Sequence, residues 1–278
     1  MPLYDTIVVG AGFAGLSAAV DLSSRGARVL VLEARSQLGG RATSYIDRAT
    51  GERVDNGQHV IFGCYRETFR FLRTIGVVED IHLQTSLSVT SIDLNNRRIR
   101  FECPHLPSPM HLLAGILDWD ALPARERLAS LRMIGPLRRV RRHMRVDCRT
   151  SDVVSHETVR DWLIRHGQGP RVRELLWEPL ALSALNQPAD LASATPFARV
   201  LAEVCGSSVT DAAVGIPAKP LEEFFALPAR RFIEAHGGEV RKRAPAKLVA
   251  TSRQLLGVET RGDLLTAKTI ISAVPFVA

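Results

Sequence analysis

The feature that most constrains this chain is a glycine pattern near its start, Gly10-Ala-Gly12-Phe-Ala-Gly15, which matches G-x-G-x-x-G. A short β-branched run, residues 5–10, leads into it, and residues 13–25 follow with the apolar spacing of a helix. A second apolar run spans residues 27–32. A strand, a tight turn, a helix and a strand within about thirty residues predict a βαβ unit with parallel strands.

Each glycine of this motif has a steric role. Gly10 permits the tight turn, Gly12 lets the backbone approach a pyrophosphate, and Gly15 allows the helix to pack closely on the strand. The start of the helix offers unpaired N–H groups and a partial positive charge to phosphates. Glu33 ends the second strand, where its carboxylate can accept ribose hydroxyls and would repel a 2′-phosphate. These residues predict a Rossmann-like site for an adenine dinucleotide; the alternative is a βαβ unit with a surface glutamate and no nucleotide.

The residues after the second strand favour FAD over NAD. Glu33-Ala34-Arg35 is followed by Leu38-Gly39-Gly40-Arg41-Ala42, a second glycine pair with an arginine. This pattern resembles the flavin signature of the amine oxidase and carotenoid desaturase superfamily. The resemblance implies that these residues, with Phe13 and Ala14 of the first turn, bind FAD. Arg41 would offset phosphate charge, although the chain has 32 Arg against 4 Lys, so a plain surface arginine is the alternative.

Residues 54–65 narrow the resemblance. The run Val54-Asp-Asn-Gly-Gln-His59-Val-Ile-Phe-Gly63 looks like the squalene-associated FAD-dependent desaturases, whose characterised activity is hydroxysqualene dehydroxylation. Segments at residues 109–113, 177–188 and 192–201 agree with that family. The resemblance implies an FAD-dependent oxidoreductase that acts on a lipophilic isoprenoid. A phytoene-type carotenoid desaturase or an amine oxidase remains the alternative enzyme.

The same resemblance implies that Gly57, Gln58 and His59 lie near the flavin. His59 is our candidate for the acid that protonates a departing hydroxyl, because imidazole changes charge near neutral pH, and Gln58 is a second catalytic candidate. The alternative for His59 is a side chain that bonds the backbone and shapes its loop. A leucine-rich stripe in residues 175–185 suits the wall of a hydrocarbon site, and ordinary helix packing explains it equally.

A second α/β pattern closes the chain, with a helix at residues 221–236 and strands at 239–243 and 269–274. We therefore expect an α/β protein whose Rossmann-like FAD-binding domain is split in sequence by a largely helical α+β substrate domain. The expected divisions are residues 1–85, 86–214 and 215–278. Within the last part, the resemblance implies that the backbone of Val240 contacts adenine.

The positive charge is concentrated in one segment. Nine arginines, two acids and no lysine lie between Arg125 and Arg149, whereas acids and bases balance in the remainder of the chain. The helical pattern there is interrupted at Gly135-Pro136, which predicts two helices. Apolar residues interleave with the arginines, so the segment is expected to contact an anionic membrane; a solvated helix face is the alternative. We expect no nucleic-acid partner, because stacking aromatic residues are absent from the segment.

The cysteines and the apolar runs indicate the compartment. Cys64, Cys103, Cys148 and Cys205 are widely spaced, without a metal or disulfide pattern, which suits a reducing compartment and predicts no metal site. No run of about 18 apolar residues is present, so we expect a cytoplasmic protein, peripheral on the membrane at most. Members of the resembled family continue past the strand that precedes Pro275, with a glycine-containing FAD segment. A truncated chain is therefore expected, with a second chain as one way to complete the FAD site.

Overall fold

The computed structural model describes residues 3–92, 96–146, 156–250 and 255–275. Contacts within the chain divide it into two compact units. The first unit holds residues 1–60, 66–82 and 216–278, and the second holds residues 61–65 and 83–215. The sequence predicted domain boundaries after residues 85 and 214, and the structure places them after residues 82 and 215. In addition, the short stretch 61–65 belongs to the second unit.

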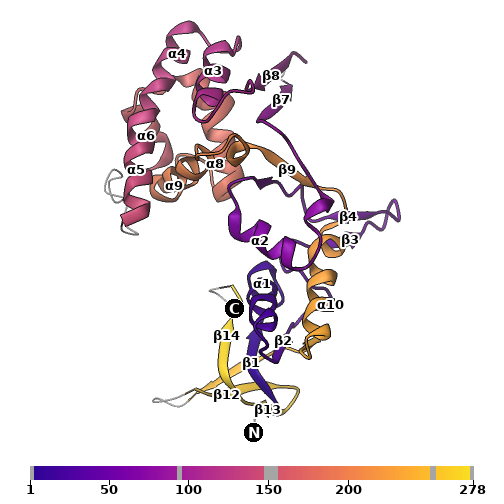
Figure 1. The fold of residues 1–278 in the computed structure, drawn as a ribbon. Coiled ribbons are helices and arrows are strands. Elements are labelled where there is room, and N and C mark those ends of the chain that lie inside the picture. Colours follow the sequence, from indigo (N-terminus) through magenta and orange to yellow (C-terminus); the bar gives the residue numbers. More distant parts are fainter. Residues whose placement is uncertain (1–2, 93–95, 147–155, 251–254, 276–278) are drawn as a thin grey trace. The chain divides into compact units, whose positions relative to one another are not determined.

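The first unit combines a parallel sheet with helices and smaller antiparallel sheets (Figure 1). In chain order its elements are β1 (Tyr4–Val9), α1 (Phe13–Ser24), β2 (Val29–Leu32), β3 (Ser44–Ile46), β4 (Arg53–Asp55), α2 (Arg66–Thr74), η1 (Val78–Asp80), η5 (Glu222–Ala226), α10 (Leu227–Ala235), β10 (Glu239–Arg241), β11 (Lys247–Ala250), β12 (Leu255–Thr260), β13 (Asp263–Leu265) and β14 (Ala267–Ser272). The π-helical turn η5 runs directly into α10, so the predicted helix at 221–236 is present.

The parallel sheet has the strand order β10-β2-β1-β14. Thr6 of β1 pairs with Val29 on one side and with Thr269 on the other, and every neighbouring pair in this sheet is parallel. The strands predicted at both ends of the chain therefore form one sheet, which confirms the split α/β fold. Because the strands run the same way, their carboxyl ends meet at one edge, where ligands of open α/β sheets bind.

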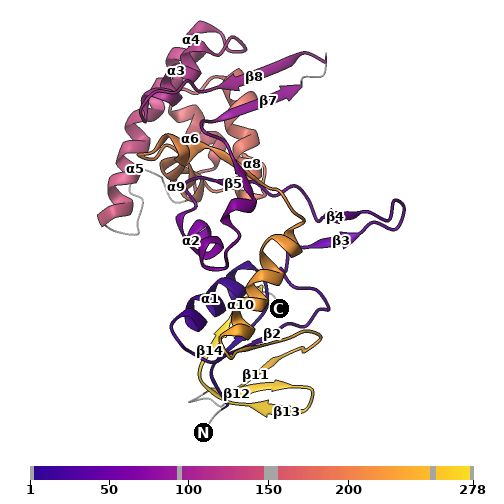
Figure 2. The ribbon, with the colours of Figure 1, turned by 45° about the vertical axis from the view of Figure 1, so that its right-hand side comes forward.

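The two faces of this sheet are covered differently. Side chains alternate between the faces of a strand, and Ile7, Val9 and Leu30 share one buried cluster with Val258 of β12. The antiparallel sheet β11-β12-β13 therefore covers that face. On the opposite face α1 and α10 lie side by side and contact each other (Figure 2). The sheet is thus the middle layer of three.

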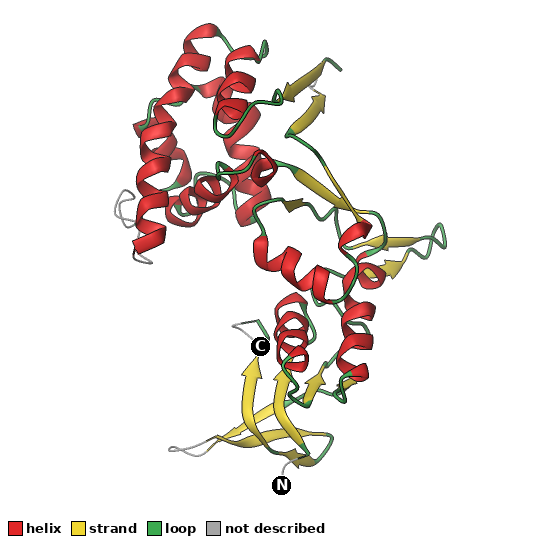
Figure 3. Ribbon diagram, viewed as in Figure 1, coloured by secondary structure: helices red, strands yellow, loops and turns green. Residues whose placement is uncertain are grey.

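The second unit is mainly helical (Figure 3). Its elements are β5 (Ile61–Phe62), β7 (Ser88–Ile92), β8 (Arg98–Glu102), α3 (Met110–Asp118), α4 (Ala124–Ser130), η2 (Leu131–Met133), α5 (Ile134–Val146), α6 (Val159–Arg165), α7 (Pro170–Val172), η3 (Arg173–Trp177), α8 (Glu178–Leu185), α9 (Ala194–Val204) and η4 (Val209–Ala212). The strands β6 (Ile81–Leu83) and β9 (Val214–Pro217) occupy the stretches of sequence where the chain passes from one unit to the other, and they share a sheet with β5.

The leucine-rich stripe of the second unit belongs to its core. Trp177 is buried there, and Leu175, Leu176, Leu180 and Leu185 pack against the same cluster. Leu182 lies on the other side of α8 with 52% of its surface exposed. Most of the stripe therefore contributes to ordinary helix packing in the core of the second unit.

The arginine segment forms two helices as predicted, but the break lies elsewhere. The α-helical pattern is interrupted at η2, and Pro136 is the third residue of α5. The first turn of a helix tolerates proline because its N–H groups have no intrahelical acceptor, so Gly135-Pro136 need not end a helix.

Several apolar side chains of the same segment are buried, whereas Leu128 of α4 is 63% exposed. Met133, Leu137 and Val140 are at most 9% exposed and lie in the core of the second unit. Arg138 and Arg142 are exposed on the outer side of α5. The amphipathic pattern therefore describes a helix packed on its own protein, with arginines toward solvent. Residues 147–149, including Cys148, lie outside the described residues.

Candidate functional site

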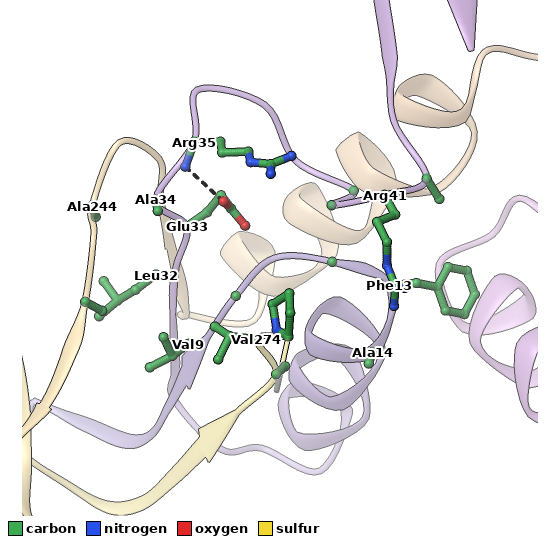
Figure 4. A pocket seen from close by; sticks show the side chains of 18 of the residues that line it. Val9, Phe13, Ala14, Leu32, Glu33, Ala34, Arg35, Arg41, Ala244 and Val274 are labelled. Atoms are coloured by element: carbon green, nitrogen blue, oxygen red, sulfur yellow. Dashed lines mark hydrogen bonds between the residues drawn. The ribbon is translucent and has the colours of Figure 1, made fainter. Parts of the chain in front are cut away.

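A cavity of about 1040 Å³ lies in the first unit at the carboxyl ends of β1, β2 and β14 (Figure 4). Five segments and one histidine contribute its lining. The residues are Val9, Gly10, Gly12, Phe13, Ala14, Leu32, Glu33, Ala34, Arg35, Gly39, Gly40, Arg41, Ala42, His59, Ala244, Pro245, Ala246, Ala273, Val274 and Pro275. Most residues predicted to bind the cofactor therefore lie together around one space.

The first glycine turn takes the conformation that its sequence predicts. Gly10 has a φ of +102°, and a Cβ on Gly15 would lie 2.0 Å from the Gly10 carbonyl oxygen. Only glycine fits at Gly15, which acts through packing and does not line the cavity. Gly12 precedes the first residue of α1 and has no side chain to cap the helix. The first N–H groups of α1, which have no intrahelical acceptor, are left for a ligand, and no acidic side chain in that turn opposes an anion.

The second glycine pair lies directly against the first turn. The Gly39 amide donates to the Ala11 carbonyl over 2.8 Å. A Cβ on Gly40 would lie 3.0 Å from the Gly12 Cα, and one on Gly39 would lie 2.4 Å from the Ala42 carbonyl oxygen. A side chain at Gly40 would push the two loops apart, and one at Gly39 would distort the second loop itself. The pair therefore brings two stretches of bare backbone together on one side of the cavity.

Glu33 faces the glycine turn. Its Oε2 accepts a 2.8 Å hydrogen bond from the Ala11 amide, and its Oε1 accepts a 2.9 Å bond from the Arg35 amide (Figure 4). The residue is 8% exposed, so the backbone holds the carboxylate in one orientation. A carboxylate oxygen has more than one acceptor position, so both oxygens can still accept from hydroxyl groups of a sugar.

Two arginines supply positive charge at the cavity. Arg35 and Arg41 both line it, and both are exposed. In Figure 4 the Arg41 side chain runs from the second glycine loop toward the first turn of α1, where Phe13 and Ala14 lie. A guanidinium there can neutralise a diphosphate bound at the helix start.

The segment that follows β4 reaches the cavity only through His59. Its Nδ1 lies 2.9 Å from the Gly57 carbonyl oxygen. A carbonyl only accepts, so this contact favours the tautomer in which Nδ1 carries the hydrogen. Gln58 is exposed, and neither Gln58 nor Gly57, with its φ of +121°, lines the cavity.

Val240 was expected to contact adenine through its backbone. Its side chain is buried, it pairs with Val31 in the sheet, and it is not among the lining residues of the cavity. The residues Ala244, Pro245 and Ala246, a few positions further on, do line the cavity, and the Ala244 amide donates to the Glu33 carbonyl over 2.8 Å. They follow the end of β10, just as Ala273 and Val274 follow the end of β14. These residues were not among the predicted site residues, although their place after two predicted strands of a parallel sheet could have indicated them.

The parts of the cavity suit an adenine dinucleotide. Small and aliphatic side chains, such as Leu32 and Ala246, line one end, Glu33 lies beside them, and bare backbone with a helix start lies beyond. Apolar, sugar-binding and phosphate-binding surfaces thus occur in the order in which adenosine diphosphate presents its groups. The donor set agrees with the cofactor expected from the sequence.

The family model described as flavin containing amine oxidoreductase matches residues 13–278. The chain belongs to this family. Its cofactor is FAD, and the residues that line the cavity fit that cofactor.

The chain is similar to a hydroxysqualene dehydroxylase and to zeta-carotene desaturases. The chain is 29% identical to hydroxysqualene dehydroxylase of Zymomonas mobilis over 236 residues, which cover 84% of this chain and 52% of that protein. It is 26% identical to zeta-carotene desaturase of Arabidopsis thaliana over 186 residues, 65% of this chain and 32% of the relative. A solved structure of putrescine oxidase bound to putrescine shares the fold, with a TM-score of 0.64 at 21% identity over 98% of this chain and 58% of that one. The chain spans about half or less of the length of the curated relatives it matches.

Metal-binding clusters and membrane-spanning helices are both absent from the part of the chain that the structure describes. No group of three or more His, Cys, Asp or Glu side chains there could hold a metal ion. No helix in the same residues has both the length and the apolar character needed to cross a bilayer.

Proposed function

We propose that this chain is the cofactor-binding part of an FAD-dependent oxidoreductase of isoprenoid metabolism, and that its reaction is the reductive dehydroxylation of hydroxysqualene to squalene. The observation that carries the proposal is the match to a hydroxysqualene dehydroxylase across 84% of the chain, which includes residues of both units. The dinucleotide cavity supplies the chemical basis, because it gathers glycine backbone, a helix start and Glu33 at one edge of the sheet.

In this reaction a C–OH bond of the substrate breaks, a hydride joins the carbon, and the hydroxyl takes a proton and leaves as water. FAD, when bound in its reduced form, supplies the hydride. The chain itself would hold the cofactor. The backbone at Gly12 and Gly40 and the first N–H groups of α1 would bind the diphosphate, Arg41 would neutralise it, and Glu33 would accept hydrogen bonds from the ribose.

His59 is the residue of the cavity that is best suited to supply the proton. Its Nδ1 is engaged by the Gly57 carbonyl, so Nε2 is the donor when the ring is charged. We expect His59→Ala to keep FAD and to lower turnover by about 10²-fold or more. Exposed His82 provides the control, since His82→Ala should change neither property. Normal turnover in His59→Ala would leave the histidine with only a structural role.

A second candidate reaction is carotenoid desaturation, which the zeta-carotene desaturase match favours. The two reactions run in opposite redox directions, since a desaturase removes hydrogen and a reductive dehydroxylase delivers it. Purified protein loaded with FAD should therefore be tested with hydroxysqualene under reducing conditions and with a carotene under oxidising conditions, with an amine in a third assay. Squalene formed only from hydroxysqualene supports the leading proposal, and oxidation of the carotene or the amine would replace it.

A non-catalytic flavin-binding chain, or one half of a split enzyme, is the candidate from another class. It is favoured by the coverage, since the chain spans 52% of the hydroxysqualene dehydroxylase it matches. Purification separates these outcomes. Yellow protein that turns over by itself supports the enzyme, yellow protein that needs a co-purified polypeptide supports a split enzyme, and yellow inactive protein supports a flavin-binding chain.

We also propose that the exposed arginines of α5 contact an anionic membrane. The buried state of Leu137 and Val140 restricts this contact to electrostatic attraction, with Arg138 and Arg142 on the solvent side. Such binding should weaken steeply as salt rises. Co-sedimentation with anionic vesicles at low and high salt tests it, and Arg138→Gln combined with Arg142→Gln should reduce binding. Vesicle binding that changes neither with salt concentration nor with the two arginine substitutions would contradict the proposal.

A further inference from the structure

The hairpin β3–β4 is joined to the start of the helix η5–α10 by a small hydrogen-bond relay. Asp55 Oδ1 accepts a 2.7 Å bond from Ser44 Oγ and a 2.9 Å bond from the Leu221 amide. Ser44 Oγ in turn accepts a 3.1 Å bond from the Glu222 amide. Ser44 is fully buried and Asp55 is half-buried. The two side chains therefore satisfy amides that the first turn of a helix leaves without intrahelical acceptors.

The helix held in this way packs against the start of α1, which follows the first glycine turn, through Phe225 and Phe13. Phe225, in the first turn of η5, is 1% exposed, and its ring centroid lies 5.0 Å from that of Phe13. Phe71 completes the cluster, with its centroid 5.1 Å from Phe13 and 6.4 Å from Phe225. Phe13 is the first residue of α1 and lines the cavity. The position of the helix start therefore limits where the phosphate-binding turn can lie.

The same helix start and hairpin also reach the second glycine loop and His59. A Cβ on Gly39 would lie 3.5 Å from Cζ of Phe225, so the aromatic ring lies against that loop. Asn56, next to Asp55, donates from its side-chain amide to the Arg41 carbonyl over 3.3 Å, and the chain then continues to His59. Three parts of the cavity are thus connected to one relay.

From these contacts we propose that Asp55 and Ser44 are positioning residues of the FAD site. They form a latch that fixes the two glycine loops and the His59 segment at the separation that FAD requires. Neither residue lines the cavity, so the latch acts through η5 and Phe225 and makes no contact with the cofactor. The inference rests on the assignment of the cavity to FAD and is independent of which substrate is reduced or oxidised.

Three variants separate the hydrogen bonds of the latch from its charge. Asp55→Ala and Ser44→Ala remove the relay, whereas Asp55→Asn keeps an oxygen in the accepting position and loses only the charge. Asp47→Ala is the matched control, because Asp47 lies in the turn of the same hairpin and its side chain accepts hydrogen bonds from Ala49 and Thr50 of that turn.

The first measurement is FAD affinity, followed by quenching of flavin fluorescence. We expect Asp55→Ala and Ser44→Ala to raise Kd at least tenfold, Asp55→Asn to raise it less than about threefold, and Asp47→Ala to leave it unchanged. Rescue by Asn distinguishes a relay of hydrogen bonds from a general need for an acid. Wild-type affinity in both alanine variants would overturn the proposal, and so would equal loss in Asp47→Ala.

The second measurement is amide hydrogen exchange of the protein without FAD, which needs neither cofactor binding nor activity. In Asp55→Ala we expect faster exchange at residues 221–226 and also at both glycine loops, residues 10–13 and 39–42. The amides of β1 and β2 should exchange as slowly as in the wild type, and this result would show that the first unit is still folded. Faster exchange confined to 221–226 would show that the latch caps a helix and does not position the site, whatever the substrate assays find.

Discussion

The replacement of Glu33 by glutamine tests the site most directly, because the side chain keeps its shape and loses one acceptor. In the structure each carboxylate oxygen accepts from a backbone amide, Ala11 on one side and Arg35 on the other. Glutamine offers one oxygen and one NH₂ group, so either the Ala11 or the Arg35 amide would face another donor. Because Glu33 is 8% exposed, water cannot readily replace the lost acceptor.

The magnitude follows from these two bonds. A hydrogen bond to a charged acceptor contributes about 1.5–3 kcal/mol, and a buried donor left unsatisfied costs about 1–3 kcal/mol. These two ranges describe largely the same loss and are not added, so we expect Glu33→Gln to destabilise the first unit by about 1.5–3 kcal/mol. Loss of one charged acceptor for the ribose should also weaken FAD binding by about tenfold or more, since about 1.4 kcal/mol corresponds to a factor of ten.

The assay must report on the first unit alone. Tryptophans at positions 119, 162 and 177 all lie in the second unit, so their fluorescence would miss the effect. Native-state hydrogen exchange of β1 and β2 gives the opening free energy of the sheet, and FAD titration gives the affinity. Exposed Glu79, changed to glutamine, is the control. The reasoning about the buried carboxylate is wrong if the opening free energy of β1 and β2 in Glu33→Gln lies within about 0.5 kcal/mol of the wild-type value and FAD binds equally well.

Three further predictions concern other parts of the chain. Gly15→Ala should abolish measurable FAD retention, because its Cβ would lie 2.0 Å from the Gly10 carbonyl oxygen; a yellow, fully loaded variant would refute the steric argument. Arg241 and the Tyr4 hydroxyl lower the pKa of Glu239 from its ordinary 4.5, so the ionised carboxylate stabilises the fold above that pH and stabilises it less as the pH falls. Tyr4→Phe should therefore move the midpoint of acid unfolding, measured by hydrogen exchange of β1, to higher pH. An unchanged midpoint would argue against the hydrogen bond between Tyr4 and Glu239. Burial raises the pKa of the Cys103 thiol to about 11, so it should react with a disulfide reagent at pH 8 only after unfolding, and fast reaction of the native protein would contradict its burial.

Much of the site followed from the sequence, because glycines report local backbone geometry. The conformation of Gly10 and the close approach of Gly15 are needs that only glycine meets, so their spacing predicted the turn and its contact with the strand. Glu33 was predicted because it ends an apolar strand, and strand ends at one edge of a parallel sheet bring side chains together. The local pattern was sufficient wherever the site depends on residues close in the chain.

Where tertiary packing decides, the sequence was insufficient. The alternation of arginine and apolar residues in α5 is the same for a helix on a membrane and for one packed on its own core, and only the burial of Val140 separates the two. Similarly, Val240 and Ala244 lie on the same short stretch, and the pairing of Val240 with Val31 decides which of them reaches the cavity. The relay through Asp55 joins residues more than 160 positions apart, which no local spacing reveals.

The pairing of β1 with β14 sets an order of events during translation. Tyr4 pairs with Ala267, and Ala273 and Val274 then complete the cavity that Gly10 began. The ribosome must therefore release nearly all of the described residues before the dinucleotide meets a finished site, while residues 83–215 form a continuous stretch that can fold earlier. Until β14 has been synthesised, the edge of β1 that pairs with it has no hydrogen-bond partner from β14, and chaperones can bind there.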